Sequence, residues 1–348
     1  LNLQSTNFAN CIIDTTNFSN ADLSSVVFNK ANVTNSIFSN TSMNNVYTSG
    51  LKSSGNSGTP CVASPCNLKI IKGYIINDRV DLTRADLSFS NLTGAHLNNA
   101  LLNSANLGAS ILDGADLHSA DLTNAYLGGS SLVGTLIAYS TLYGATLSGV
   151  DLSSQSGWSG VRTGHIRGSP TLPSGYRLIT GYIVGRDVSL ESADLAGADL
   201  SNLFLYGINL RNANLSNANL TNSDISNAYM LGTVLTGANL TNTYIDPYQY
   251  GQCNIRSGNI VGLPSLPSYM RLINRTLVYR CADLRQADLS NTDLSSIDLY
   301  GTNLAGANLS NTNRNTCSSL EPTKSLCHQS AKQQSNECTI HHDQSSKC

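Results

Sequence analysis

Large apolar residues recur at every fifth position through most of this chain. The residue two places before each of them is usually small, as in Ala85-Asp86-Leu87 and Ala115-Asp116-Leu117. An α-helix repeats its buried positions about every 3.6 residues and a strand about every 2, so a five-residue period fits neither element. We expect the chain to turn a corner with every five residues and to stack on itself as a solenoid.

We call the large residue of each pentapeptide its central residue. In the first block the central residues are Leu3, Phe8, Ile13, Phe18, Leu23, Phe28, Val33, Phe38 and Met43. The second block runs in steps of five from Leu82 to Leu152, the third from Leu190 to Ile245 and the fourth from Leu284 to Leu309. The small partner is nearly always Ala, Ser, Thr or Val, a restriction that a narrow, closely packed interior would impose.

These A-(D/N)-L-x-x repeats resemble the pentapeptide-repeat proteins, and the resemblance covers most of residues 1–313. It implies an all-β fold, a right-handed quadrilateral β-helix in which four pentapeptides form one coil. The central residue and its small partner would point inward. Residues twenty apart would then share a face, so Phe8 should stack on Phe28 and Phe18 on Phe38, with rings about 4.8 Å apart. The family has many roles, so the resemblance implies little about function.

A second, longer repeat interrupts the coils. Residues 70–76, Ile-Ile-Lys-Gly-Tyr-Ile-Ile, resemble residues 178–184, Leu-Ile-Thr-Gly-Tyr-Ile-Val, and a third copy begins at Leu272-Ile273. We interpret each copy as a Gly/Pro-rich insert with one short apolar strand, followed by a new run of coils. The inserts either space the stacks or cap their open ends. The expected segments are residues 1–50, 51–155, 156–250, 251–313 and a Cys-rich polar tail at 314–348.

The amino-acid composition of the chain limits the classes of partner that we expect it to bind. The chain has 348 residues, of which 12% are charged, and a net charge of −2, whereas about a quarter of a typical globular chain is charged. A nucleic-acid binder would show a basic stripe, and a DNA mimic would need dense negative charge. No stretch approaches the roughly 20 apolar residues of a membrane span. We therefore expect no nucleic-acid partner and no membrane span.

Cysteine usage indicates an oxidising compartment. Cys11 occupies a small inward position, which predicts a buried free thiol. Cys61 and Cys66 are both missing from the second insert, and Cys253 and Cys281 are both replaced, by Ser159 and Asp187. Cysteines that form a disulfide are expected to be lost together, so this pattern predicts the disulfides Cys61–Cys66 and Cys253–Cys281. The alternative is that both cysteines of each pair are missing by chance.

The tail carries Cys317, Cys327, Cys338 and Cys348. Two intrachain disulfides, in any of three pairings, compete with cross-links between chains. A zinc site that combines Cys338 and His341 or His342 with Cys317 and Cys327 is a third alternative, although the close cysteine pairs of zinc knuckles are missing.

Nine asparagines begin N-x-S/T sequons. They are Asn17, Asn32, Asn40, Asn91, Asn214, Asn219, Asn239, Asn274 and Asn308. The repeat generates such triplets by composition alone, but most of these asparagines would face outward. They are therefore N-glycosylation candidates for a secreted glycoprotein.

No catalytic constellation is evident, because no histidine lies beside a plausible nucleophile and the aspartates repeat with the coil as outward residues. We expect no enzyme activity, no cofactor and no metal site, and we assign the lone Trp158 to packing.

The favoured function is a secreted structural rod that assembles end to end into an extracellular or cell-surface fibre or layer. A binding module for a protein, carbohydrate or ice is the alternative, using the outward residues Tyr126, Tyr143, Tyr206, Tyr229, Tyr244 and Tyr300. A DNA-mimicking topoisomerase inhibitor, suggested by the family resemblance, is a third interpretation.

Overall fold

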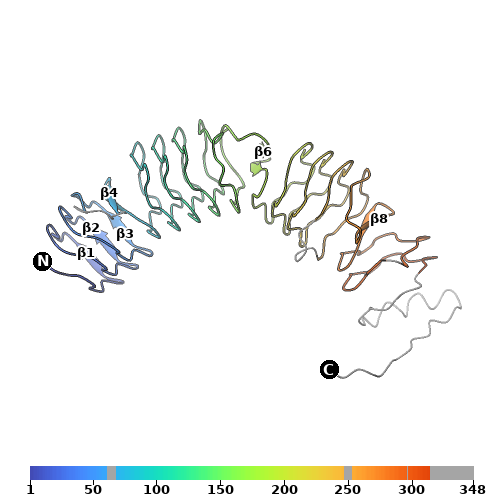
Figure 1. Cartoon of the computed structure of the whole chain (residues 1–348), viewed down its shortest axis with the longest axis horizontal. Coiled ribbons are helices and arrows are strands. Elements are labelled where there is room, and N and C mark those ends of the chain that lie inside the picture. The colour runs from blue at the N-terminus through green and yellow to red at the C-terminus, as the bar shows by residue number, and fades with distance from the viewer. Residues whose placement is uncertain (61–67, 247–252, 296, 314–348) are drawn as a thin grey trace, which may run out of the picture.

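The computed structural model describes residues 1–60, 68–246, 253–295 and 297–313. Within these residues the chain contains no helix, and its coils stack into an arch that runs from the N-terminal block to the fourth block (Figure 1). The strands are short. They are β1 Ile12–Asp14, β2 Asn32–Thr34, β3 Lys52–Ser54, β4 Lys69–Ile71, β5 Tyr74–Ile76, β6 Arg177–Ile179, β7 Tyr182–Val184, β8 Arg271–Ile273 and β9 Thr276–Val278.

The coils close through two kinds of backbone hydrogen bond. Along each side, the central residue donates to the next coil, as Leu107 does to the carbonyl of Tyr126 at 2.7 Å, and Tyr126 donates back to Ala105 at 2.9 Å. At each corner, the small residue donates to the preceding central residue, as Ala105 does to Leu102 at 3.0 Å. Within the uninterrupted coils the parallel bridges therefore join residues twenty positions apart, which confirms four pentapeptides per coil.

The left-handed backbone at the corners explains part of the sequence pattern. The residue two places after the central residue has a positive φ in most pentapeptides, for example 56° at Asn99 and 60° at Gly94. Glycine and asparagine adopt this conformation at low cost. The repeat therefore favours them at this position.

The core is a single column of central and small residues. Leu107 and Leu117 are 0% exposed, as the inward assignment requires. The predicted aromatic columns are also confirmed. The rings of Phe8 and Phe28 stack at 5.7 Å, and those of Phe18 and Phe38 at 5.2 Å. The slightly larger spacing than that between strands is consistent with offset stacking.

The prediction of a buried thiol at Cys11 is wrong. Cys11 is exposed, although it occupies the small position of its pentapeptide. In this structure its coil, residues 1–20, bridges only to the coil of residues 21–40, so Cys11 is covered on one side only. The same reason leaves Leu3 and Phe8 only partly buried.

The expectation of one apolar strand per insert is also wrong. Each insert contains an antiparallel hairpin, formed by β4 and β5, by β6 and β7, and by β8 and β9. The two turn residues of each hairpin have positive φ, such as 46° at Thr180 and 83° at Gly181. This is the geometry of a type I′ turn, which suits the twist of two paired strands.

The stack of coils continues through the inserts. Parallel bridges join Lys52 to Asp81, Arg162 to Ser189 and Arg256 to Asp283. These pairs are 29, 27 and 27 positions apart in place of 20, so each insert is a coil enlarged by its hairpin. The inserts are therefore part of the solenoid, and the division into five segments stays a prediction.

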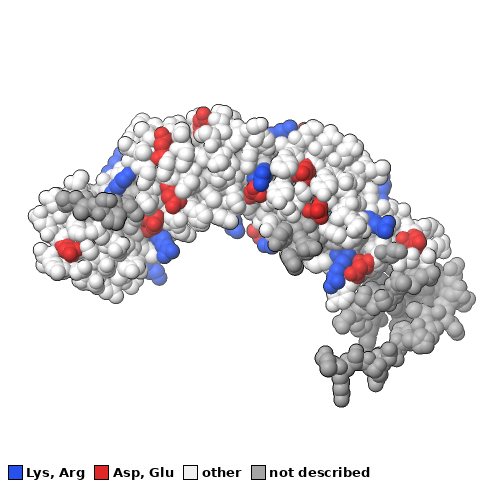
Figure 2. All heavy atoms as spheres, viewed as in Figure 1, with Lys and Arg blue, Asp and Glu red and all other residues white. Residues whose placement is uncertain are grey.

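Two further observations complete the fold. The described residues include no helix that is long and apolar enough to cross a membrane. Charged side chains are sparse on the face shown in Figure 2, and both signs are interspersed.

Six cysteines of the predicted framework lie outside the described residues. They are Cys61, Cys66, Cys317, Cys327, Cys338 and Cys348. The alternative zinc ligands His341 and His342 also lie outside them.

Candidate functional site

The three enlarged coils are the places where the chain departs from its repeat, and they are the candidate site. We call them the first junction (residues 51–81), the second junction (161–189) and the third junction (255–283). The second residue of each junction is basic, at Lys52, Arg162 and Arg256. Each also contains a hydroxyl that accepts from a buried hairpin backbone N–H. The hydroxyls belong to Ser53, Thr163 and Ser257, at 2.8, 3.1 and 2.9 Å.

The basic residue of each junction faces an acid on the following coil. The Nζ of Lys52 lies 3.5 Å from Asp81, and the guanidinium of Arg162 lies 3.7 Å from Glu191. At the third junction, the hydrogen bond from Arg285 lowers the pKa of the buried Asp283, and the charge of Arg256 adds to this effect. The ion pairs at the first and second junctions link the two sides of these junctions.

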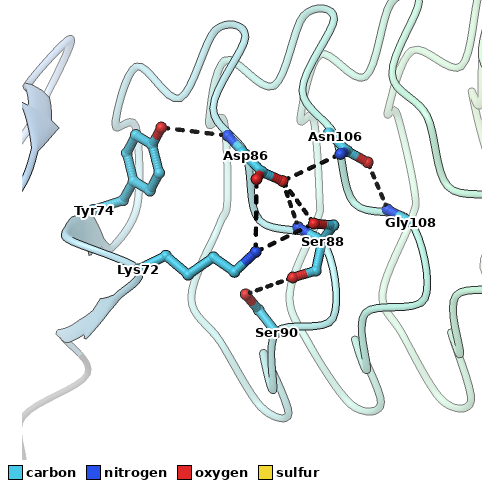
Figure 3. Close-up of polar contacts among 7 residues, drawn as sticks. All are labelled: Lys72, Tyr74, Asp86, Ser88, Ser90, Asn106 and Gly108. Atoms are coloured by element: carbon cyan, nitrogen blue, oxygen red, sulfur yellow. Dashed lines mark hydrogen bonds and ion pairs between the residues drawn. The ribbon is translucent and has the colours of Figure 1, made fainter.

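The first hairpin also caps the block that follows it (Figure 3). The backbone N–H of Asp86 donates to the hydroxyl of Tyr74 at 3.3 Å, where an ordinary coil would offer a carbonyl. Lys72 lies 3.7 Å from the Asp86 carboxylate and donates to Ser88 Oγ at 3.2 Å. The hairpin thus replaces the hydrogen-bonding edge of a missing coil side.

The second hairpin repeats this arrangement. Tyr182 accepts from the backbone N–H of Asp194, also at 3.3 Å. A basic side chain on the first strand of each of these hairpins donates to a carbonyl of the next block. Lys69 Nζ reaches Thr93 at 2.6 Å, and Arg177 reaches Ser201 at 3.1 Å. Both open donors and open acceptors of the block edge are therefore satisfied by side chains.

The aspartates before the central residues are structural. Asp86 Oδ1 accepts from the N–H and the hydroxyl of Ser88, at 3.1 and 2.7 Å, and from Asn106 Nδ2 at 3.1 Å. Hydrogen bonds from Ser88 lower the pKa of this carboxyl. The described residues contain no cluster of three His, Cys, Asp or Glu side chains with the spacing of a metal site.

A disulfide joins Cys253, two residues before the third junction, to Cys281 within it. At the second junction the equivalent positions are Ser159, two residues before it, and Asp187 within it. The N–H of Gly160 donates to the carbonyl of Asp187 at 2.8 Å, as that of Asn254 does to the carbonyl of Cys281. The disulfide therefore ties an enlarged coil to the coil after it, at a place where the backbone already pairs.

Comparison with known proteins identifies the fold family. A family model of pentapeptide repeats matches the chain in eight copies, over residues 2–40, 81–118, 115–153, 189–227, 213–246 and 280–313, which is more than half of its length. The chain belongs to the pentapeptide repeat family. Members of this family fold as right-handed quadrilateral β-helices, as the resemblance implied.

Solved structures with pentapeptide repeats resemble the chain at low identity. HetL, involved in heterocyst differentiation regulation in the cyanobacterium Nostoc sp. strain PCC 7120, is 21% identical over 88% of this chain and 86% of its own, with a TM-score of 0.20. QnrB1, a plasmid-mediated fluoroquinolone resistance protein, is 14% identical over 87% of this chain and 93% of its own, with a TM-score of 0.18. A thylakoid-lumen protein of Arabidopsis thaliana is 20% identical over 47% and 66%, with a TM-score of 0.15. Such scores carry no argument about function. No curated protein matches the chain.

The candidate glycosylation asparagines of this pentapeptide repeat protein fall into two groups. Asn214, Asn219 and Asn239 are partly buried, and the first two donate through Nδ2 to Asp194 and Asp199, each at 3.0 Å. The other six are exposed, at Asn17, Asn32, Asn40, Asn91, Asn274 and Asn308. Among these exposed asparagines, Asn308 donates to Asp288 and Asn274 to the carbonyl of Ser290.

The tyrosines of the alternative binding interpretation do not form one flat face. Tyr229 and Tyr126 lie on different columns of the β-helix. Tyr206, Tyr229 and Tyr300 lie beneath arginines, with guanidinium-to-ring distances of 5.2, 5.3 and 4.6 Å. Tyr126, Tyr143 and Tyr244 are 49%, 44% and 46% exposed. A binding face that combines all six is therefore not present.

The structure brings together other residues that the sequence reasoning kept apart. The imidazole of His165 lies 4.9 Å from the ring of Tyr143 and 6.5 Å from that of Tyr182. Tyr143 and His165 border a hollow of about 610 Å³ at the second junction. Trp158, assigned to packing, is 2% exposed and lies against Tyr176 at 5.0 Å, which confirms that assignment.

Proposed function

We propose that this pentapeptide repeat protein is a non-enzymatic, extracellular structural rod that self-associates end to end. The observation that carries the proposal is the continuity of the solenoid. Backbone bridges cross all three junctions, and ion pairs and hairpin caps cross the first two, so a load applied to one block is transmitted to the next. A solenoid end exposes unpaired backbone groups, and such edges favour pairing with another copy.

The surface supports a structural role over that of a DNA mimic. A mimic needs a continuous band of negative charge, whereas charges of both signs are scattered over the face in Figure 2. Basic residues lie mostly at the junctions, and none occurs between Arg84 and Arg162. The aspartates of the intervening coils accept hydrogen bonds from their own turns, as Asp116 does from the N–H of His118 at 2.9 Å.

The extracellular assignment has two supports. The Cys253–Cys281 disulfide suits an oxidising compartment. Exposed sequons offer sites for glycans. The side-chain amide nitrogens of Asn17 and Asn91 make no hydrogen bond to any residue that the structure describes, whereas those of Asn214 and Asn219 do. We expect glycans at Asn17 and Asn91, and low occupancy at Asn214 and Asn219.

Electron microscopy of negatively stained, full-length protein tests the structural role. We expect arched rods joined end to end, with chains that lengthen as the protein concentration rises. Isolated single arches at every concentration would overturn the assembly proposal. Glycopeptide mapping of protein from a eukaryotic secretory host tests the glycans separately, and unmodified Asn17 and Asn91 would remove that support.

A further inference from the structure

The three junctions share one scaffold, so they serve as internal controls for one another. Gly168, Gly262 and Gly58 occupy equivalent turns, and Pro170, Pro264 and Pro60 follow them at the same distance. On this alignment His165 corresponds to Asn259 and Gly55, and all three have a positive φ, of 50°, 52° and 65°. Gly and Asn adopt this backbone most readily. Histidine also adopts this backbone, so the turn is the same in all three copies and only the second junction places an imidazole there.

Two neighbours of His165 also differ from the other junctions. Arg167 corresponds to Val261 and Ser57. Gly144 donates to Gly164 as Gly237 donates to Gly258, each at 2.7 Å, so Tyr143 corresponds to Thr236. The aromatic ring, the imidazole and the guanidinium therefore occur together at the second junction. The third junction has the equivalent backbone without these three side chains.

These side chains surround one open hollow. Asn124, Tyr143, His165, Arg167 and Thr180 line it, and among the described residues that do so none is acidic. Asn124, His165, Arg167 and Thr180 are exposed, and the Tyr143 ring is 44% exposed. The hollow thus offers amide, imidazole and guanidinium donors beside an aromatic ring. An anionic group is the natural partner of such donors.

A second ring extends the site along the same column of the solenoid. Tyr126 is bridged to Thr146, and Thr146 to Arg167, so the ring lies two coils before the guanidinium. A Cβ added at Gly108 would come within 2.6 Å of the Tyr126 ring, and one added at Gly128 within 2.6 Å of the Tyr126 hydroxyl. Neither glycine has a positive φ. These glycines leave room for the ring, which lies between them and remains 49% exposed.

We infer that the second junction binds an acidic saccharide, with sugar rings packed on Tyr126 and Tyr143 and a carboxylate or sulfate held by His165 and Arg167. Two coils span roughly 10 Å, which matches about two sugar units. The inference goes beyond the structural role and does not depend on it, because binding and end-to-end assembly are measured separately.

Isothermal titration calorimetry of the full chain tests the inference with three hexasaccharides. These are oligogalacturonate, which bears carboxylates, κ-carrageenan hexasaccharide, which bears sulfates, and neutral cellohexaose. We expect at least one acidic probe to bind, more weakly as salt rises, and cellohexaose to bind at least tenfold more weakly. The acidic probe that binds identifies the anion. Failure of both acidic probes, or equal binding of cellohexaose, would overturn the inference.

The third junction provides the substitutions that test this site in the second junction. Tyr143→Thr, His165→Asn and Arg167→Val install the residues of the third junction, so the backbone should be preserved, and circular dichroism checks this. Loss of a charge-assisted contact typically weakens binding about tenfold, so we expect Arg167→Val to bind the acidic probe about tenfold more weakly and the triple variant not to bind it. Arg84→Ala, an exposed arginine outside the site, should bind like the wild type. Unchanged affinity in the triple variant would place binding elsewhere and contradict the inference.

Discussion

The hydroxyl of Tyr182 accepts a 3.3 Å hydrogen bond from the backbone N–H of Asp194, where a continuous coil would place a carbonyl. Tyr74 makes the same bond to Asp86 at the first junction. A hairpin side chain therefore takes over the role of the β-helix backbone. This substitution lets the solenoid admit extra residues without leaving donors of the next block unpaired.

Removal of this hydroxyl should loosen the edge of the third block. We expect Tyr182→Phe to lower the free energy of local unfolding by about 1 kcal/mol, the typical net value of one hydrogen bond. Hydrogen exchange at the Asp194 amide should be correspondingly faster, because repeat arrays open locally. Tyr244→Phe removes a more exposed hydroxyl and serves as the control. An unchanged exchange rate at the Asp194 amide would show that the Tyr182 hydroxyl does not stabilise the edge of the third block.

A matched pair of glycines tests the close contact between coils at the second junction. Gly168 and Gly197 both have positive φ, of 83° and 67°. A Cβ at Gly168 would come within 2.7 Å of the backbone nitrogen of Ser148, whereas a Cβ at Gly197 would meet nothing within 4 Å. We expect Gly197→Ala to cost about 1 kcal/mol for the left-handed backbone alone, and Gly168→Ala to cost about 1 to 3 kcal/mol more. Equal urea-unfolding midpoints for the two variants would contradict the described contact.

The inward assignment makes a sharp distinction between two nearby leucines. Leu107 is a central residue and 0% exposed, whereas Leu101 is an outward residue and 40% exposed. We expect Leu107→Ala to lower the free energy of unfolding by about 2 to 5 kcal/mol. Leu101→Ala should cost no more than about 0.5 kcal/mol. Urea titrations followed by circular dichroism measure both. A greater loss from Leu101→Ala would reverse the assignment of faces.

The aspartate turns predict sensitivity to acid. Hydrogen bonds from Ser88 hold the pKa of Asp86 below its usual 3.8, and those from Ser201 do the same for Asp199. A carboxyl with a lowered folded pKa stabilises the fold above its unfolded pKa and loses this contribution as the pH falls through the folded value. We expect the Tm to be steady from about pH 7 to 5 and to fall below about pH 4. In Asp86→Asn the fall should be smaller, and a Tm that is constant down to about pH 2.5 would contradict the expectation.

The coils could be predicted from the sequence because nearly every pentapeptide places one large apolar residue and one small residue toward the interior. The stacked pairs Phe8–Phe28 and Phe18–Phe38 follow from the period and from four sides per coil. The hairpins were missed because the apolar run of residues 70–76 was interpreted as one strand. Its Lys-Gly centre is in fact a two-residue turn. Cys11 was misplaced because a local pattern does not show that its coil is covered on one side only in this structure.

The grouping of Tyr143, His165 and Arg167 depends on stacking distances that sequence spacing does not give. Tyr143 belongs to the repeat, whereas His165 and Arg167 belong to an insert of altered length. A comparison of the three inserts could have drawn attention to His165, because the equivalent positions hold Gly and Asn.

The central claim is that each insert is an enlarged coil of one continuous solenoid. Ser159 and Asp187 occupy at the second junction the positions that Cys253 and Cys281 occupy at the third. Non-reducing peptide mapping of the double variant Ser159→Cys, Asp187→Cys tests this equivalence, with Ser159→Cys alone as the control that cannot form the bond. The account predicts a disulfide between positions 159 and 187 beside the native Cys253–Cys281 bond. Free thiols at both new positions, in protein whose Cys253–Cys281 bond is intact, would contradict it.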